Sequence, residues 1–397
     1  MIKLYTAFTK EIDNAEAAVR EIREQLDPAA NTLKNTVGII HFYYEFIETG
    51  VCQAVIDAMP FEIAGCVSSF MATDSEYGDI ALSITMITSD ETDFDIRVVE
   101  DLDTKTKEQI SDEVKKISHE LCAKEKPKLV MSFIPPLQQF GGDDLISAVN
   151  TLPEPFPMFG TIAFNTESKG NLNYVAGGGK ISSACAFVAM YGSLEPTFSV
   201  TTSFAFDENF SGHAKITESD GLVLKKINDI SALQYLKEQG MITSDNKVSG
   251  SAIWAVPAIL TYPNGTRIVS AFLEIVEGTE YIVSTGSMEI GTKIKFGFLD
   301  GDKTLASANK LMNELCERQK NGIIAYSCAA RAWSLGAKFF SEAQRIANCA
   351  EKHEEENGEP LVYTVTYSGG EICPIPDNTG KLVNALHKYT LVACSFY

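Results

Sequence analysis

The sequence is short of basic residues relative to acidic ones. It has 33 Lys and Arg against 53 Asp and Glu, which gives a formal net charge of −20 at pH 7. Nucleic acids and anionic lipid surfaces are bound through basic surfaces. We therefore expect neither nucleic-acid binding nor attachment to an anionic membrane, and the acidic excess is consistent with solubility alone.

Long hydrophobic runs and paired cysteines are also missing. No window approaches the roughly 20 apolar residues of a membrane-spanning helix, and residues 1–5 do not begin a signal peptide. The nine cysteines are odd in number and include no C-x-x-C pair. Such usage favours reduced thiols over a disulfide framework. We predict a cytoplasmic protein without membrane insertion.

The familiar motifs of cofactor and metal sites are absent from the sequence. The run 177–180 is Gly-Gly-Gly-Lys, but it lacks the upstream glycine of a phosphate-binding loop, and no G-x-G-x-x-G opens a helix after a strand. The five histidines and the cysteines form no cluster with ligand spacing. We expect no metal and no cofactor.

The sequence does contain one pattern three times. Each copy has an apolar run, a helix-like segment and a second apolar run that ends in a turn of small residues. Two buried strands joined by a helix form a right-handed βαβ crossover. We predict an α/β fold of repeated βαβ-like units, which form two subdomains with mixed sheets. The paired runs are 37–43 with 61–69, 128–133 with 157–163, and 322–328 with 362–372.

Several other segments have local signals. Apolar residues at helical spacing predict helices at 11–26, with Asp13 and Glu16 as a capping box, and at 104–124. The tripeptide at 263–265, Pro-Asn-Gly, predicts a hairpin turn. The acidic stretch 351–359 is expected to be a solvated loop.

Five segments resemble the FIST domain, an N- and C-terminal pair found in intracellular signal-transduction proteins. The resemblance implies an N-terminal extension at 1–29, a FIST N-like α/β domain at 30–217 and a FIST C-like α/β domain at 218–397. It also implies a sensory domain that binds a small ligand, with amino acids favoured, and is often fused to an output domain. The sequence shows no kinase, cyclase or chemotaxis output segment. The segments are 63–69, 215–221, 327–331, 368–372 and 386–392.

The turns of small residues are the predicted binding site. Ligands of βαβ units tend to bind beyond the carboxyl ends of the strands, and here those ends are the turns. We expect an amino acid or a related small carboxylate as the ligand. The predicted ligand-binding residues are Gly65, Cys66, Ser68, Ser69, Ser327, Cys328, Arg331, Ser368, Gly369, Gly370 and Glu371.

Three of these features have a specific expected role. The planar guanidinium of Arg331 could grip a carboxylate, and the carboxylate of Glu371 could accept an amino group. The turn at 66–69 could supply backbone amides. The alternatives are a structural carboxylate partner for Arg331, an internal salt bridge for Glu371 with Arg331 as a candidate partner, and a tight turn in which Cys66 is buried filler.

The residues and the resemblance together predict an intracellular sensory domain. Its ligand would shift the two halves relative to each other, and a signalling output protein or a fused output domain would read that change. No catalytic residue is expected. One alternative is a hydrolase or acyl-transfer enzyme that uses Cys328 or Ser327, although no motif supplies a histidine base. The other is a non-enzymatic protein-interaction scaffold.

Overall fold

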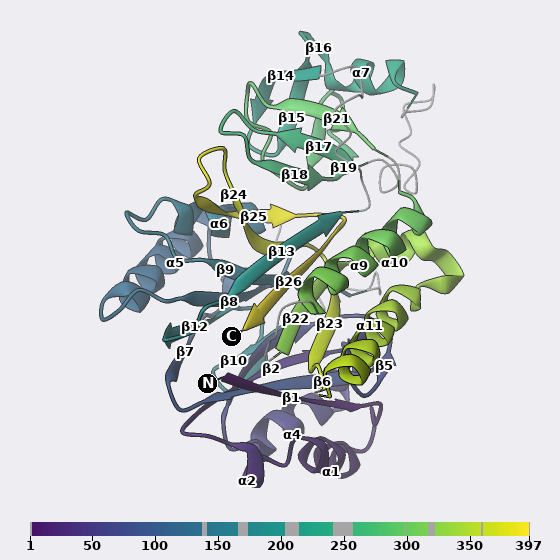
Figure 1. The fold of residues 1–397 in the computed structure, drawn as a ribbon. Helices are drawn as coiled ribbons and strands as arrows, with labels where there is room; N and C mark the ends of the chain where they lie inside the picture. Colours follow the sequence, from purple (N-terminus) through teal and green to yellow (C-terminus); the bar gives the residue numbers. More distant parts are fainter. Residues whose placement is uncertain are drawn as a thin grey trace.

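The structure is a computed structural model. It consists of two lobes (Figure 1). The residues that the structure describes form four β-sheets. Three of them build a core lobe, and the fourth builds a small lobe that is inserted between β13 (Thr197–Thr202) and α9 (Gly301–Cys316). Figure 1 shows the small lobe at the top, in teal and green. The described residues are 2–136, 141–165, 174–202, 214–240, 257–297, 299–316, 322–358 and 360–396.

A pair of parallel strands joined through helices lies in each sheet of the core lobe. All three pairs overlap the paired apolar runs of the sequence, although the predicted run 362–372 also includes the start of β24 (Glu371–Pro376). Each pair has an antiparallel strand on its other side, so the predicted α/β fold with mixed sheets is confirmed. The pairs are β2 (Asn35–Phe42) with β3 (Glu62–Val67), β8 (Leu129–Ile134) with β9 (Met158–Ile162), and β22 (Gly322–Cys328) with β23 (Tyr363–Ser368).

The remaining strands complete these sheets. Sheet 1 has the order β1–β6–β2–β3–β10–β11, sheet 2 the order β25–β24–β9–β8–β12–β7, and sheet 3 the order β13–β26–β22–β23–β4–β5. The bounds are β1 (Ile2–Thr9), β4 (Met71–Thr73), β5 (Tyr77–Gly78), β6 (Leu82–Ser89), β7 (Thr92–Val99), β10 (Val175–Gly177), β11 (Lys180–Ser182), β12 (Cys185–Gly192), β24 (Glu371–Pro376), β25 (Leu382–His387) and β26 (Thr390–Phe396).

Each parallel pair is followed by a hairpin that leaves its own sheet. The hairpin after β3 places β4 beside β23, the one after β9 places β10 beside β3, and the one after β23 places β24 beside β9. The three sheets are therefore linked in a closed ring. The carboxyl ends of β3, β9 and β23 meet within it, where the N–H of Phe164 donates to the Val67 carbonyl (3.1 Å) and that of Gly369 to the Ile162 carbonyl (3.0 Å).

The core of this lobe has inner and outer layers. Side chains alternate between the two faces of a strand. In β2, Val37 and Ile39 face an inner core shared by all three sheets, whereas Ile40 and Phe42 pack under helices of the first unit. The other two sheets have their own outer layers under helices. The inner apolar core thus holds the three sheets together.

Helices cover the outer faces of the sheets, and two of these helices differ from the sequence predictions. The N-cap of the first helix is Asn14, whose side chain accepts from the Ala17 N–H, rather than Asp13. The acidic stretch at 351–357 is helical, because Glu and Lys are good helix formers and Lys352 pairs with Glu356 one turn on. The helices are α1 (Ala15–Leu26), α2 (Pro28–Asn31), α3 (Glu45–Glu48), α4 (Val51–Ala58), α5 (Lys107–Cys122), α6 (Gly142–Asn150), α7 (Ala232–Glu238), α10 (Ala329–Leu335) and α11 (Ser341–Asn357), with 3-10 turns at Leu102–Thr104 and Gly336–Lys338.

The small lobe is a sheet with its own apolar core under α7. Its hairpin between β17 and β18 contains the predicted turn, where Gly265 has φ +86°. The strands are β14 (Ala214–Asp220), β15 (Val223–Ile227), β16 (Ile230–Ser231), β17 (Ala258–Thr261), β18 (Arg267–Ser270), β19 (Phe272–Ile275), β20 (Ile282–Ser284) and β21 (Lys293–Phe296).

The predicted domain boundaries fall within elements of the fold. The predicted division at 217/218 lies inside β14, and β1 of the predicted N-terminal extension pairs along its whole length with β6.

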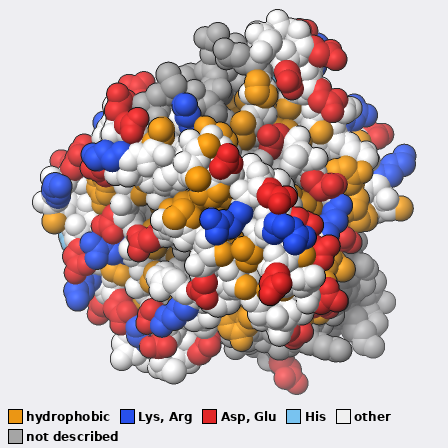
Figure 2. Space-filling model, turned by 90° about the horizontal axis from the view of Figure 1, so that it is seen from below, with side chains coloured by type: hydrophobic (Ala, Val, Ile, Leu, Met, Phe, Trp, Pro, Cys, Tyr) orange, Lys and Arg blue, Asp and Glu red, His pale blue; other side chains and the backbone are white. Residues whose placement is uncertain are grey.

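The surface shows the acidic excess. Figure 2, which views the molecule from below, shows Asp and Glu side chains spread across the face, with Lys and Arg interspersed among them. This face has no continuous basic patch among the residues that the structure describes. Within the same residues, no helix has the length and apolar character to span a membrane.

Candidate functional site

A cavity of about 390 Å³ lies where the predicted binding turns meet the small lobe. The ends of β8 and β9 form one wall, and the end of β23 with the start of α10 forms a second. The small lobe closes the cavity through Leu222, Ala271, Ser284 and Thr285. The cavity therefore lies beyond the carboxyl ends of two parallel pairs, which is where ligands of such units bind.

Lys388 supplies positive charge to this cavity. It lies in the turn between β25 and β26, is half-buried, and lines the cavity. Its ammonium group donates to the carbonyl of Gly369. An ammonium group has three donors. Among the described residues, the other N–H donors of Lys388 have no acceptor, so they can face a ligand in the cavity.

Glu371 lies directly behind the cavity wall. It is fully buried and accepts hydrogen bonds from Ser368 Oγ (2.6 Å) and Thr390 Oγ1 (2.7 Å). Burial raises the pKa of its carboxyl to about 7, and the two hydroxyl bonds and the charge of Lys388 partly oppose that shift. Ser368 lines the cavity and also donates to Glu371, so it connects Glu371 to the cavity.

A second carboxyl with a raised pKa lies within the electrostatic reach of Lys388. Asp143 is in the first turn of α6, next to Gly142, which lines the cavity. Burial raises the pKa of Asp143 to about 7; the charge of Lys388 lowers it, that of Asp144 raises it, and a bond with the backbone of Ser287 lowers it. Because Ser287 belongs to the small lobe, Asp143 joins the two lobes.

The rest of the cavity wall is largely apolar and includes an exposed aromatic side chain. Trp333 is 49% exposed and lines the cavity together with Phe164. The two rings meet edge to face with centroids 5.9 Å apart. An exposed tryptophan beside an apolar cavity with few polar groups is typical of a small-molecule site.

Arg331 lies outside this cavity. It is fully buried, and its Nε and Nη2 donate to Glu342 Oε2 at 3.0 and 2.7 Å. Ser327 is equally buried and donates to Glu342 Oε1 at 2.5 Å. The guanidinium therefore has a structural carboxylate partner, which is the alternative to binding a ligand carboxylate. The partner is Glu342 of α11 rather than Glu371.

The predicted turn of the first unit is also buried. Ser68 donates from Oγ to the Tyr367 carbonyl at 2.5 Å, and Cys66 Sγ lies 3.9 Å from His41 Nδ1. A Cβ added to Gly65 would lie 1.8 Å from the Ile40 carbonyl oxygen, so only glycine fits beside that strand. These residues and Ser69 hold the junction of the three units and do not line the cavity.

Cys328, Ser368 and Gly369 are the predicted residues that line the cavity. The other eight stay predictions without a contact to it. Of these eight, Gly370 lies beside the Lys388 side chain: a Cβ there would be 2.3 Å from Nζ. Cys328 is buried, and burial, followed by the negative charge of Glu371, raises its pKa to about 12. Its thiol is therefore protonated at neutral pH.

Sequence reasoning missed Lys388, Trp333 and Asp143. Lys388 lies within segment 386–392, which contributes to the family resemblance, but a lysine in a turn gives no local sign of the cavity. Trp333 follows Arg331 by two residues, and its exposure emerges only in the fold. Among the described residues, no group of His, Cys, Asp and Glu is placed to hold a metal ion.

Comparisons with known proteins identify the family. The FIST N domain matches residues 36–230, and the FIST C domain matches residues 232–374. No curated protein matches the chain. A solved structure described as PurLQS from Thermotoga maritima aligns with 6% identity over 100% of this chain and 72% of that chain, but its TM-score of 0.21 is too low to support an argument about the fold. FIST domains are sensory domains of signal transduction. Because the two matches cover most of its length, the chain belongs to the FIST family.

Proposed function

We propose that this chain is a sensory domain that binds a small carboxylate, with amino acids favoured, in the cavity between the strand ends and the small lobe. The observation that carries the proposal is Lys388, a half-buried cation in a cavity that both lobes line, with a single acceptor, the Gly369 carbonyl, among the described residues. Cavities of this size, mostly apolar with a few polar groups, are typical for small ligands.

Lys388 is the group that would bind the ligand carboxylate. Hydrogen bonds between an ammonium and a carboxylate are about twice as strong as neutral ones, and partial burial limits their screening by salt. Arg331, which the sequence favours for this role, is already paired with Glu342. The proposal therefore moves the carboxylate contact from Arg331 to Lys388.

The amino group of an amino acid would find its complement in the carboxyls that flank Lys388. Glu371 is buried behind Ser368, so the Ser368 hydroxyl would make the direct contact and Glu371 would act through it. Asp143 approaches from α6 beside Gly142. The apolar remainder of the ligand would contact Phe164 and Trp333.

The cavity also supports the proposed relay between the two halves. Ser284 and Thr285 of the small lobe face the same cavity as Cys328 and Ser368 of the core lobe. A ligand that contacts both lobes has an affinity that depends on their relative position, and it can shift that position by its differential affinity. We propose that an output protein or a fused output domain reads this shift.

A thermal-shift screen of amino acids and organic acids tests the proposal. A ligand present at about 100 times its dissociation constant stabilises the folded state by roughly 2.7 kcal/mol. We expect a shift with amino acids or related carboxylates, and its loss in Lys388→Gln.

The matched control for this screen is Lys105→Gln. Lys105 is also half-buried and also donates to a backbone carbonyl, that of Glu100, but it lies away from the cavity. This variant should keep the shift. A shift that survives in Lys388→Gln, or no shift with any carboxylate, would contradict the proposal.

The proposal assigns no catalytic step to this chain. It also places the protein in the cytoplasm, which the described cysteines support because each of them is a free thiol. Reduced thiols are usual in that compartment.

A further inference from the structure

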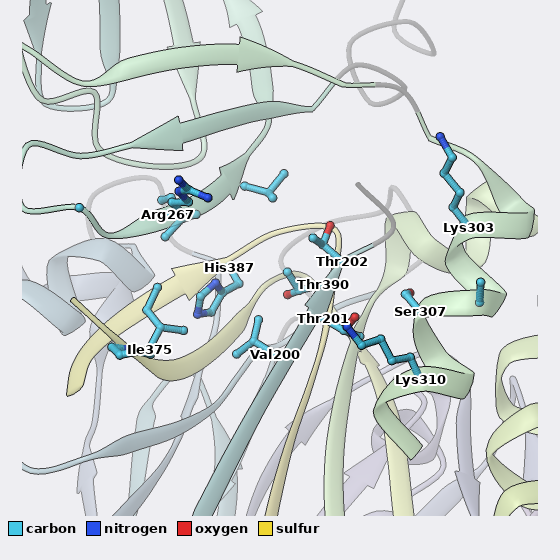
Figure 3. A pocket seen from close by; sticks show the side chains of 15 residues that line it. Val200, Thr201, Thr202, Arg267, Lys303, Ser307, Lys310, Ile375, His387 and Thr390 are labelled. Carbon is cyan, nitrogen blue, oxygen red and sulfur yellow. The ribbon is translucent and has the colours of Figure 1, made fainter. Parts of the chain in front are cut away.

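A second, larger hollow lies on the other side of the turn that carries Lys388. Its volume is about 740 Å³, and it opens between β13, one face of α9, the hairpin of β24 and β25, and β18 of the small lobe (Figure 3). His387 and Thr390 line this hollow, whereas Lys388 and Tyr389, between them in the sequence, line the first cavity. The two sites therefore share one turn as a wall.

The charged side chains that line this hollow are basic. Arg267 comes from β18, and Lys303 and Lys310 come from α9, two helical turns apart. Figure 3 shows Arg267 on one side of the hollow and the two lysines on the other, with Lys310 extending toward β13. Within the described part of the chain, no Asp or Glu lines the hollow. In a protein of net charge −20, this is a local reversal of sign.

The acidic neighbours of these lysines only partly neutralise them. Lys303 lies 3.9 Å from Asp300, and Lys310 lies 3.9 Å from Glu314. Both lysine side chains are well exposed, and at such sites an ion pair of this length contributes little. For Arg267, no ion pair is recorded with any described residue. These cations are therefore available to a ligand.

A buried guanidinium lies behind the wall, and its charge is balanced by Glu342. Ser307, which lines the hollow, accepts a hydrogen bond from Nη2 of the buried Arg331 at 2.9 Å. Nη1 of the same guanidinium is buried without a hydrogen-bond partner among the described residues. Thr201 and Thr390 also line the hollow, and the Thr390 hydroxyl donates to Glu371 on its inner side. The positive charge that faces the hollow therefore comes from Arg267, Lys303 and Lys310.

We propose that this hollow binds a small phosphate-bearing molecule. A phosphate group carries close to two negative charges at neutral pH and has three strong acceptor oxygens. The forked guanidinium of Arg267 suits a phosphate group, and the lysines act as point charges that can meet a second one. The volume falls within the range of small-molecule sites. This inference does not depend on the ligand of the first cavity.

Calorimetric titration of the full chain with pyrophosphate and with ATP, at low ionic strength and again at 0.15 M salt, tests the proposal. We expect saturable binding that weakens with salt, since the cations are exposed. Arg267→Gln and Lys310→Gln should each weaken binding by about two- to fivefold. The triple variant, which combines these two substitutions with Lys303→Gln, should weaken binding more than tenfold. Lys310→Arg should retain the affinity.

The matched control is Lys116→Gln. Lys116 and Lys310 are both 76% exposed, and each faces a glutamate four residues on, Glu120 and Glu314. Lys116 lies on α5, away from the hollow. Lys116→Gln should leave the affinity unchanged. Absence of binding by both probes at low ionic strength, or equal weakening by Lys116→Gln and Lys310→Gln, would overturn the proposal.

Discussion

At the scale of single residues, Glu371 lies between the two sites. Ser368 connects it to the first cavity, and Thr390 connects it to the hollow behind. Its raised pKa of about 7 means that the folded protein holds a proton that the unfolded chain loses near pH 4.5. The free energy of unfolding contributed by Glu371 therefore falls as the pH rises from about 4.5 to 7.

Replacing Glu371 with Gln, which mimics the protonated carboxyl, should remove this dependence. We expect the variant to gain stability relative to the wild type as the pH rises, by about 3 kcal/mol between pH 4.5 and 7, with no further gain above pH 7. Urea denaturation at several pH values measures the difference. A difference that does not change with pH would contradict the assignment.

The comparison with wild type is needed because buried histidines titrate in the opposite sense. Burial lowers the pKa of His41 and of His387 to about 4, so both are neutral in the folded protein and protonate more readily when it unfolds. Their contribution to stability is present above pH 6.5 and is lost as the pH falls toward 4. The difference between variant and wild type removes this common part.

The ion pair of Arg331 with Glu342 gives a second prediction at this scale. Both side chains are fully buried, so Arg331→Met leaves an unpaired buried carboxylate. We expect a loss of about 3–5 kcal/mol in the free energy of unfolding, and partial recovery in the double variant with Glu342→Leu. Arg97→Met, which breaks the exposed pair with Asp95 at 3.0 Å, should cost less than about 1 kcal/mol. Equal losses in the two single variants would show that burial does not govern this pair.

Cys328 gives a third prediction, which bears on the alternative of thiol catalysis. With its pKa raised to about 12, it is a protonated thiol at pH 7.5. Iodoacetamide should therefore modify Cys328 of the folded protein far more slowly than Cys328 of the urea-unfolded chain, as followed by peptide mass spectrometry. Faster modification in the folded protein would instead indicate an activated thiol and favour the enzyme alternative.

At the scale of elements, a close approach of strands sets the geometry of two parallel pairs. A Cβ added to Gly160 would lie 1.9 Å from the Ser132 carbonyl oxygen, and the equivalent atom at Gly65 would lie 1.8 Å from that of Ile40. Each glycine is in register with the residue that it would strike. The strands can adjust to such a contact only by moving their backbones.

Gly160→Ala should therefore destabilise the fold by about 3 kcal/mol or more, since overpacking against a backbone cannot be relieved by a rotamer change. Gly141→Ala is the control, because a Cβ there meets nothing within 4 Å. It should cost less than about 1 kcal/mol. Chemical denaturation of the two variants compares them. A tolerated Gly160→Ala would mean that β8 and β9 separate more easily than the register indicates.

Local sequence patterns were sufficient to predict these elements. The apolar runs predict the strands of all three parallel pairs, and the tripeptide at 263–265 predicts its hairpin, because each depends on periodicity or on turn chemistry. The prediction of a solvated loop at 351–359, where α11 ends, was wrong. A run of acidic residues suits both a solvated loop and a helix with exposed ion pairs. The pairing of each hairpin with another unit's sheet was not predicted, because contacts between distant segments leave no local pattern.

The candidate site was predicted in part for the same reason. The turns that meet at the carboxyl ends are recognisable from small residues, and Cys328, Ser368 and Gly369 do line the cavity. The sequence allowed two roles for Arg331, ligand binding or a structural ion pair, and only the fold brings it to Glu342. Lys388 is recognisable as a candidate only in the fold, which brings the turn after β25 against Gly369.

At the scale of the whole molecule, the small lobe is what turns the junction of strand ends into a cavity. It is inserted before α9, and it touches the core lobe on both sides of the turn at 387–390. A ligand in either site would therefore contact both lobes. If the ligands of both sites discriminate between lobe positions, binding at one site changes the affinity at the other, and linkage makes this change reciprocal by the same factor.

Hydrogen–deuterium exchange of the full chain, with and without a saturating carboxylate from the screen, tests the central claim most directly. The account predicts slower exchange on both walls of the first cavity at once: at 284–285 of the small lobe, and at 328–330 and 368–369 of the core lobe. In Lys388→Gln, the same carboxylate concentration should leave the exchange rates of these amides unchanged. Protection confined to one lobe, or to residues away from the cavity, would contradict a ligand site shared by the two lobes.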